Sequence, residues 1–181
     1  MDFTYTRYVE LINMLKKKNY IFSNFEDYFN YNKVVILRHD IDITLEKALK
    51  IARIEYGNGV NSTYFVLLST NFYNIFSKES YKILKEIISM GHKIGLHFDE
   101  KRYDISSYEE LEKNIECERK TMEDALNVRV KTVSMHRPSK WILSNNNEFN
   151  EIINSYSKTF LSHFKYLSDS RMHWREDVFE I

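Results

Sequence analysis

The chain has 181 residues, and its 26 Lys and Arg residues balance its 26 Asp and Glu residues, so its net charge is zero with histidine neutral. Binding to nucleic acid depends on a basic surface, and this balance therefore argues against a nucleic acid as the main partner. The length predicts a single domain over residues 1–181. The abundance of Tyr (13) and Phe (12) against few Gly (4) argues against a disordered chain.

The sequence also predicts the cellular compartment. Cys117 is the single cysteine, which excludes an intramolecular disulfide and fits a reducing environment. No apolar run approaches the roughly 18 residues that a membrane-spanning helix needs. The N-terminus has an acid at Asp2 and lacks the basic and then apolar pattern of a secretory signal. We therefore expect a cytoplasmic protein without a membrane span.

The first half of the chain begins with a helix and continues with alternating strands and helices. Apolar residues at helical spacing predict a helix over 4–18, and the aromatic and polar segment 19–33 is predicted to be a loop. Thr44 is suited to cap the next helix, which two glycines end. The elements predicted after the loop are a strand at 34–40, a helix at 44–56 and a strand at 62–68.

The second half continues this alternation. Ser107 and Glu110 form a candidate capping box at the start of a helix that reaches about residue 126. The other predicted elements are a helix at 78–90, strands at 92–98 and 130–136, a short helix at 147–156 and a strand at 159–165. Strands that alternate with helices predict an α/β fold with a parallel sheet or barrel.

The strand at 34–40 ends in a pair of carboxylates. The apolar run 34–37 is typical of a strand buried on both faces, and Asp40 and Asp42 follow with a spacing of two. Because side chains alternate along a strand, both should project to one side at its C-terminal end. A divalent cation commonly offsets the repulsion of such a pair. The alternative is an acidic loop that caps the next helix.

Polar residues also follow two later strands. His97 ends one strand, followed by two acids, and His136 and Arg137 end another. The C-terminal ends of parallel strands meet in one place, where α/β folds hold their chemistry. Asp and His together suit Zn²⁺ or a similar ion, which lowers the pKa of bound water to about 7. A free carboxylate can then act as a general base, oriented by an arginine.

Each histidine also has a structural alternative. His39 alternates with its neighbours and should face away from the site, and His92 is predicted to hydrogen bond the backbone of a loop. His97 could be a ligand or a buried, hydrogen-bonded histidine, and the same two roles are open for His136. Most aromatic residues should belong to the core, and two could instead stack on a sugar, namely Trp141 and Trp174.

These motifs, in this order, resemble the polysaccharide deacetylase superfamily, which contains the NodB-homology or carbohydrate esterase family 4-like enzymes. The closest resemblance is to a cytoplasmic branch found in surface-polysaccharide biosynthesis, with an RHD-x-D first motif. The matching segments are LRHDID at 37–42, STYFVLL at 62–68, GHKIGLHFDE at 91–100, SMHRPS at 134–139 and YLSDSRMHW at 166–174. Such a resemblance implies a distorted or incomplete (β/α) barrel with a metal-dependent hydrolase site.

The resemblance also implies roles for individual residues. Asp40 matches the general base that activates water, while Asp42 and His97 match metal ligands. Arg137 matches the arginine that orients Asp40. In the last segment, Asp169 matches the acid of the fourth motif, which supports the arginine. Trp174 matches the indole of the same motif, which lines the substrate groove.

Two departures from the family pattern affect the site. The family often has a second metal histidine four residues after the first, where this chain has Lys101, so we expect His136 to be the third ligand. The family also places a late strand with a catalytic acid histidine after the fourth motif, and Ile181 falls about where that strand would begin. A missing strand would leave a barrel edge open, which favours a homo-oligomer.

The function predicted from these features is removal of an N-acetyl group from a sugar or polysaccharide precursor by a divalent-metal hydrolase, with zinc as the expected metal. One alternative is hydrolysis of another small-molecule C–N bond. The other is a non-catalytic saccharide-binding relative that has lost the catalytic acid.

Overall fold

The computed structural model of the protein describes residues 4–144 and 148–168. Four helices of twelve or more residues alternate with short strands along the chain: α1 (Tyr5–Lys17), α2 (Leu45–Gly57), α3 (Lys78–Ser89) and α4 (Tyr108–Leu126). The shorter helices are α5 (Lys140–Ser144), α6 (Lys158–Ser162) and the 3-10 helices η1 (Tyr28–Asn30) and η2 (Glu100–Arg102). No helix in these two ranges is long and apolar enough to cross a membrane.

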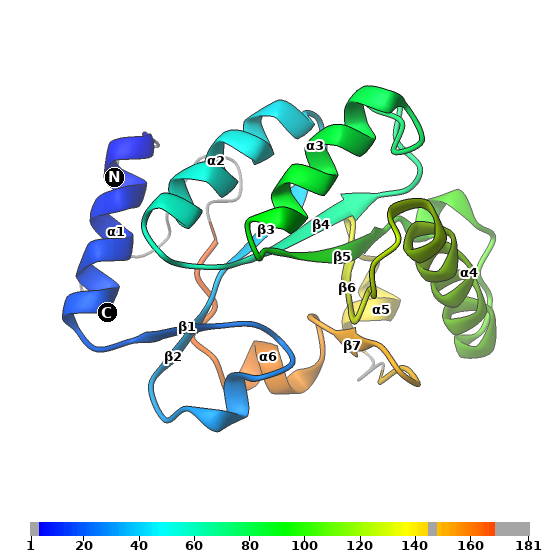
Figure 1. Cartoon of the computed structure of the whole chain (residues 1–181). Coiled ribbons are helices and arrows are strands. Elements are labelled where there is room, and N and C mark those ends of the chain that lie inside the picture. The colour runs from blue at the N-terminus through cyan, green and yellow to red at the C-terminus, as the bar shows by residue number, and fades with distance from the viewer. Residues whose placement is uncertain (1–3, 145–147, 169–181) are drawn as a thin grey trace.

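Two parallel sheets hold the strands (Figure 1). The smaller sheet pairs β1 (Ile21–Ser23) with β2 (Val34–Ile36). The larger sheet has the order β3 (Arg38–Ile41), β4 (Thr63–Leu67), β5 (Lys93–Phe98), β6 (Thr132–Met135) and β7 (Ile153–Asn154). All its neighbouring strands are parallel. In the described residues this sheet is open, which agrees with the predicted α/β fold and with an incomplete barrel.

Side chains that cap helix N-termini fix where the main helices begin. Thr44 accepts a hydrogen bond from the Lys47 amide at the start of α2, and Ser107 accepts one from the Glu110 amide at the start of α4. Each supplies an acceptor for an amide that has no partner inside its helix. The predicted caps are confirmed, and the Glu110 carboxylate also accepts hydrogen bonds from the amide and the hydroxyl of Ser106.

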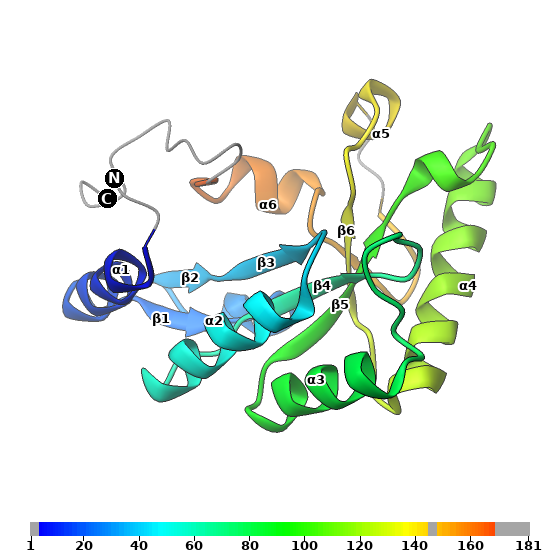
Figure 2. The same ribbon diagram turned by 90° about the horizontal axis from the view of Figure 1, so that it is seen from above.

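The main core lies between the sheet and the helices that cover one of its faces (Figures 1 and 2). Helices α2 and α3 lie side by side over this face, and α4 packs beside β5. Alternate residues of the strands point into this layer, where Tyr64, Val66, Ile94 and Leu96 join one buried apolar cluster. This packing holds the strands in register, and therefore fixes where their C-terminal ends lie.

The opposite face of the sheet is filled mainly by aromatic rings. Phe65 of β4 is fully buried and contacts Phe25 edge to face, with ring centroids 5.8 Å apart. Phe160 of α6 packs on Phe25 in the same way at 4.9 Å. Helix α6 lies on the side of the sheet away from α2 and α3 (Figure 1). These rings therefore cover the face from which the side chains of the candidate site project.

The strand predicted at 34–40 is not continuous in the structure. It divides at Leu37 into β2 and β3, which belong to different sheets, and its apolar residues are half-buried and not fully buried. The reason is that β1, in the segment predicted to be a loop, pairs with residues 34–36. Only the part from residue 38 onwards reaches the larger sheet.

Two predictions near the C-terminus are also wrong. The described part of 147–156 contains the short strand β7 instead of a helix, and the segment predicted as a strand at 159–165 begins with helix α6. Phe160 and Phe164, four residues apart, both pack against Tyr28, as two residues on one face of a helical turn do. The packing of Phe160 and Phe164 on Tyr28 thus favours a helix over a strand in this segment.

Candidate active site

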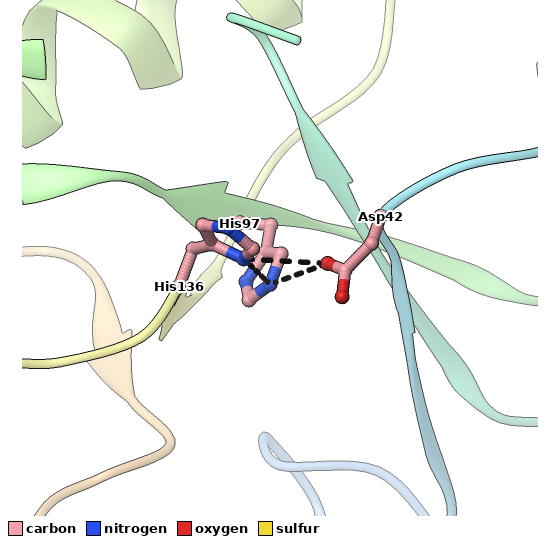
Figure 3. Close-up of side chains that lie close together, drawn as sticks. All are labelled: Asp42, His97 and His136. Atoms are coloured by element: carbon pink, nitrogen blue, oxygen red, sulfur yellow. Dashed lines mark hydrogen bonds and ion pairs between the residues drawn. The ribbon is translucent and has the colours of Figure 1, made fainter. Parts of the chain in front are cut away.

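Three side chains of the types that commonly bind metals meet at the C-terminal ends of the strands (Figure 3). Asp42 follows β3, His97 lies in β5 and His136 follows β6. Asp42 Oδ1 lies 3.3 Å from His97 Nε2 and 3.3 Å from His136 Nδ1, and the two ring nitrogens are 3.2 Å apart. One ligand atom from each residue lies within 4.8 Å of the others. The expected convergence of distant strand ends is thus observed.

The hydrogen bonds of His97 define which nitrogen faces the cluster. Its Nδ1 lies 3.2 Å from the carbonyl oxygen of Ser134, to which only an N–H can donate. In neutral His97 the Nε2 atom therefore presents a lone pair toward Asp42 and His136. A backbone carbonyl behind the distal nitrogen is the usual support of a metal-bound histidine.

The donor set fits a divalent cation. A carboxylate oxygen and two imidazole nitrogens would place several lone pairs against one another, and a cation or a proton is needed to offset that repulsion. When His97 carries protons on both nitrogens, its Nε2–H donates to Asp42, and this hydrogen bond holds the pKa of Asp42 below its usual range, with the charges of His97, His136 and Arg137 adding to it. A metal ion would take the place of that proton.

Burial differs among the three residues in a way that suits a catalytic site. The side chains of His97 and His136 are 3% and 13% exposed, whereas that of Asp42 is 49% exposed. Burial, followed by the charge of His97, lowers the pKa of His136. A rigid, buried pair of imidazoles beside an open carboxylate leaves one side of the cluster accessible to a substrate.

A second carboxylate lies beside the cluster. Asp40 Oδ2 is 4.0 Å from His97 Nε2, and its side chain is 31% exposed. Arg38, two residues earlier on β3, brings its Nη2 atom to 2.8 and 2.7 Å from the two Asp40 oxygens. Because residues two apart on a strand face the same side, Arg38 and Asp40 both project toward the interior of the open sheet. Asp40 is thus a carboxylate paired with Arg38, next to the cluster of Asp42, His97 and His136.

The structure also places the other candidate residues. Arg137 is exposed, has a positive φ of 48°, and acts electrostatically on Asp42 and His136. Its predicted role in orienting Asp40 stays a prediction, since Asp40 is held by Arg38 in the contacts described above. Lys101 is exposed on η2. Asp169 and Trp174 lie outside the described residues.

The acids after β5 take structural roles. Asp99 caps η2 by accepting from the Lys101 amide at 3.1 Å. Glu100 accepts from the hydroxyl of Ser139 at 3.0 Å and from the Ser139 amide. These contacts tie the turn after β5 to the turn after β6. They therefore support the positions of His97 and His136, which precede these turns.

His39 and His92 are structural, as predicted. His39 Nε2 lies 2.7 Å from Glu55 Oε1, on the helix-covered face of the sheet. His92 accepts a hydrogen bond from the Ser62 amide through Nδ1, and its Nε2 lies 3.0 Å from the carbonyl oxygen of Ala52. Burial lowers the pKa of His92, which favours the neutral form that these partners require.

Two supporting interactions were not predicted from the sequence, namely the pairing of Arg38 with Asp40 and the hydrogen bonds of Tyr73. Arg38 shares the i, i+2 spacing that singled out Asp40 and Asp42, and this spacing was the signal that could have identified it. Tyr73 donates through its hydroxyl to the Ile41 carbonyl at 2.7 Å and accepts from the Leu67 amide at 2.9 Å. It lies in the loop after β4 and gives no sequence signal beyond being one of many tyrosines.

The fold of this chain is similar to the folds of solved proteins. Neither a family model nor a curated protein sequence matches the chain. Among solved structures, the Streptococcus pyogenes deacetylase PplD, in complex with acetate, is 17% identical with a TM-score of 0.53, over 68% of this chain and 58% of that one. IcaB from Ammonifex degensii is 12% identical with a TM-score of 0.54, over 72% of this chain and 65% of that one.

The chain spans less than two thirds of the length of either protein, and at these identities the likeness concerns the fold. The chain shares the α/β fold of these two proteins, which confirms the fold class predicted from the sequence.

Proposed function

We propose that the protein is a divalent-metal-dependent hydrolase that removes the acetyl group from an N-acetylated sugar or polysaccharide precursor. The observation that supports this most is the cluster of Asp42, His97 and His136 at the C-terminal ends of parallel strands, with the separate carboxylate of Asp40 beside it. The likeness of the fold to that of a deacetylase solved with acetate adds to it. A cluster of ligands with a separate base is what metal-assisted amide hydrolysis requires.

The three clustered residues would hold the metal, and the borderline donor set of one carboxylate and two imidazoles favours Zn²⁺. When bound, such a metal polarises a carbonyl and lowers the pKa of water. His97 is oriented for this by the Ser134 carbonyl. His136 supplies the donor that the family pattern would place at Lys101.

Asp40 would accept a proton from the attacking water. It stays off the cluster because its oxygens are held by Arg38, and its 4.0 Å distance from His97 keeps it within one water molecule of the ligands. The leaving amine must gain a proton, and Asp40 would return to it the proton that it accepted from water, directly or through solvent.

We further propose that the enzyme acts in the cytoplasm on a precursor of a surface polysaccharide. The resemblance of its RHD-x-D motif to that branch of the superfamily supports this, as does the free Cys117. An open sheet edge is compatible with a homo-oligomer, which remains part of the proposal.

Acetate release tests the proposal directly. Purified protein equilibrated with zinc is incubated with N-acetylglucosamine and its short oligomers, and free acetate is measured enzymatically. We expect turnover by the wild type, and a loss of about 10²–10⁴-fold in kcat for Asp40→Asn. Asp104→Asn, at an exposed position, serves as the matched control.

Three results would contradict the proposal in distinguishable ways. Release of acetate that Asp40→Asn leaves unchanged would refute the role of Asp40. Sugar binding in calorimetry that survives chelation, without turnover, would favour a non-catalytic saccharide-binding protein. Turnover of cyclic amides or ureides instead of acetylated sugars would assign the site to another C–N bond.

A further inference from the structure

We propose that Arg38, and not Arg137, is the residue that positions the base Asp40, and that it does so by bridging the two edges of the open sheet. This inference rests on the proposed function, because a base needs positioning only if it reacts. Arg38 lies in the first sequence motif, whereas the family resemblance gives the role of positioning the base to Arg137 of the third motif.

The contact between Arg38 and Asp40 is direct. The Nη2 atom of Arg38 lies within hydrogen-bonding distance of both carboxylate oxygens of Asp40, at 2.8 and 2.7 Å. The two side chains are 15% and 31% exposed, so the pair is shielded on one side and open on the other. A charge-assisted contact to both oxygens fixes the rotation of the carboxylate as well as its position.

Arg38 is itself held from three strands. Its Nη1 atom donates to the Ser155 hydroxyl at 3.1 Å, and its Nη2 atom also donates to the Ser134 hydroxyl. Its guanidinium lies 4.9 Å from the centre of the Phe65 ring and 5.3 Å from that of Tyr156. A guanidinium with two serine partners and two aromatic neighbours cannot turn away from Asp40 without losing these contacts.

Arg38 and its partner Ser155 lie at opposite edges of the larger sheet. Arg38 lies on β3, one edge strand of the larger sheet, whereas Ser155 directly follows β7, the other edge strand. Within the described residues, the Arg38 side chain therefore spans the interior of the sheet and joins its two edge strands, which do not pair with each other there. The same side chain links these edges and orients the base.

Arg137 is placed differently. It is exposed and has a left-handed backbone conformation in the turn after β6. Its charge acts on Asp42 and His136, the cluster side of the site. Since Arg38 already contacts both oxygens of Asp40, the geometry gives the positioning role to Arg38.

A double-mutant cycle between Arg38 and Asp40 tests this inference. kcat and KM for acetate release are measured for Arg38→Ala, Asp40→Asn and the double variant, with a parallel cycle for Arg137→Ala. Misplacement of a catalytic group costs about 10²-fold, so we expect Arg38→Ala to lower kcat by about that factor with little change in KM. In the Asp40→Asn background the same substitution should lower kcat by less than about threefold, because it acts through Asp40.

Variants that keep part of the interaction separate positioning from folding. Arg38→Lys keeps a cation but loses the contact to Ser155, and we expect it to recover part of kcat. Guanidinium ion added to Arg38→Ala should raise its kcat, a rescue that a merely structural role would not show. Arg53→Ala, in an exposed ion pair with Glu86, is the matched control and should have wild-type activity.

If Arg38→Ala and Asp40→Asn lower kcat independently of each other, the inference is overturned. It is also overturned if Asp40 is coupled to Arg137 and not to Arg38. Neither result affects the proposed function. If the wild type releases no acetate, the proposed function fails separately. In that case the Arg38–Asp40 pairing is read from nitrogen NMR of the Arg38 guanidinium. Slow rotation of its Nη groups that is lost in Asp40→Asn supports the pairing, and free rotation in the wild type contradicts it.

Discussion

The ring of Phe65 fills the space that a side chain at Gly95 would need. A Cβ atom at Gly95 would lie 2.5 Å from two carbons of that ring and 2.8 Å from the Thr132 hydroxyl. The two residues are paired in register on β4 and β5. Glycine in the middle of a strand thus allows Phe65 to lie flat in the interior, where it supports the guanidinium of Arg38.

Gly95→Ala should therefore destabilise the protein and disturb the site. The added methyl group must push against a fully buried ring, and overpacking of this kind typically costs about 1–3 kcal/mol in the free energy of unfolding. Urea denaturation measures the loss. Gly57→Ala is the control, because nothing lies within 4 Å of its Cβ position, and we expect it to leave stability unchanged or slightly raised. Equal effects at the two glycines would contradict this account.

Glu55 makes stability depend on pH in the acid range. Its carboxylate is fully buried and is hydrogen bonded by His39, Ser62 and Tyr64. Although burial alone would raise its pKa, the charge of His39 and these hydrogen bonds lower it from 4.5 to about 2. A carboxyl group whose pKa is lower in the folded state stabilises that state above the unfolded pKa.

Glu55→Gln should accordingly lower the free energy of unfolding at neutral pH by about 3 kcal/mol. The wild type loses this advantage as the pH falls from about 4.5 toward about 2, so the two unfolding curves should approach each other there. Urea denaturation across this range checks the prediction. Glu10→Gln, in an exposed ion pair, should follow the wild type. A constant difference at all pH values would refute the assignment.

Tyr73 links the ends of β3 and β4 immediately before Asp42. Tyr73→Phe leaves the Ile41 carbonyl and the Leu67 amide without their hydroxyl partner, which should cost about 1–3 kcal/mol in stability. Because Ile41 precedes Asp42, we also expect zinc affinity to fall by about tenfold, measured by competition with a chelator. Tyr56→Phe, at an exposed tyrosine, should change neither quantity. Unchanged zinc affinity in Tyr73→Phe would show that this link does not position Asp42.

The residues of the candidate site could be singled out from the sequence because they end or follow strands whose apolar runs are distinct. That His97 and Asp42 lie close together follows from the parallel order of β3 to β6, and their role as metal ligands stays a prediction. Arg38 was missed as the partner of Asp40. Its contacts come from β4, β6 and the end of β7, and such a convergence depends on how far the sheet curves, which local pattern does not encode.

The same limit explains the errors in the fold. The helices with side-chain caps and an apolar stripe were predicted within a few residues, because their signals are local. Strand β1 is only three residues long and forms because β2 lies beside it. Helix α6 had a signal in the apolar residues Phe160, Leu161 and Phe164, whose spacing favours a helical turn over a strand.

The metal content of the purified protein tests the central claim most directly. Wild type, Asp42→Ala and the control Asp104→Ala, at an exposed position, are equilibrated with zinc, freed of excess metal and analysed by inductively coupled plasma mass spectrometry. We expect near-stoichiometric zinc in the wild type and the control, and a large loss in Asp42→Ala, because Asp42 contributes the only carboxylate of the cluster found among the described residues. Absence of bound zinc in the wild type, or equal zinc in Asp42→Ala, would contradict the proposed metal centre.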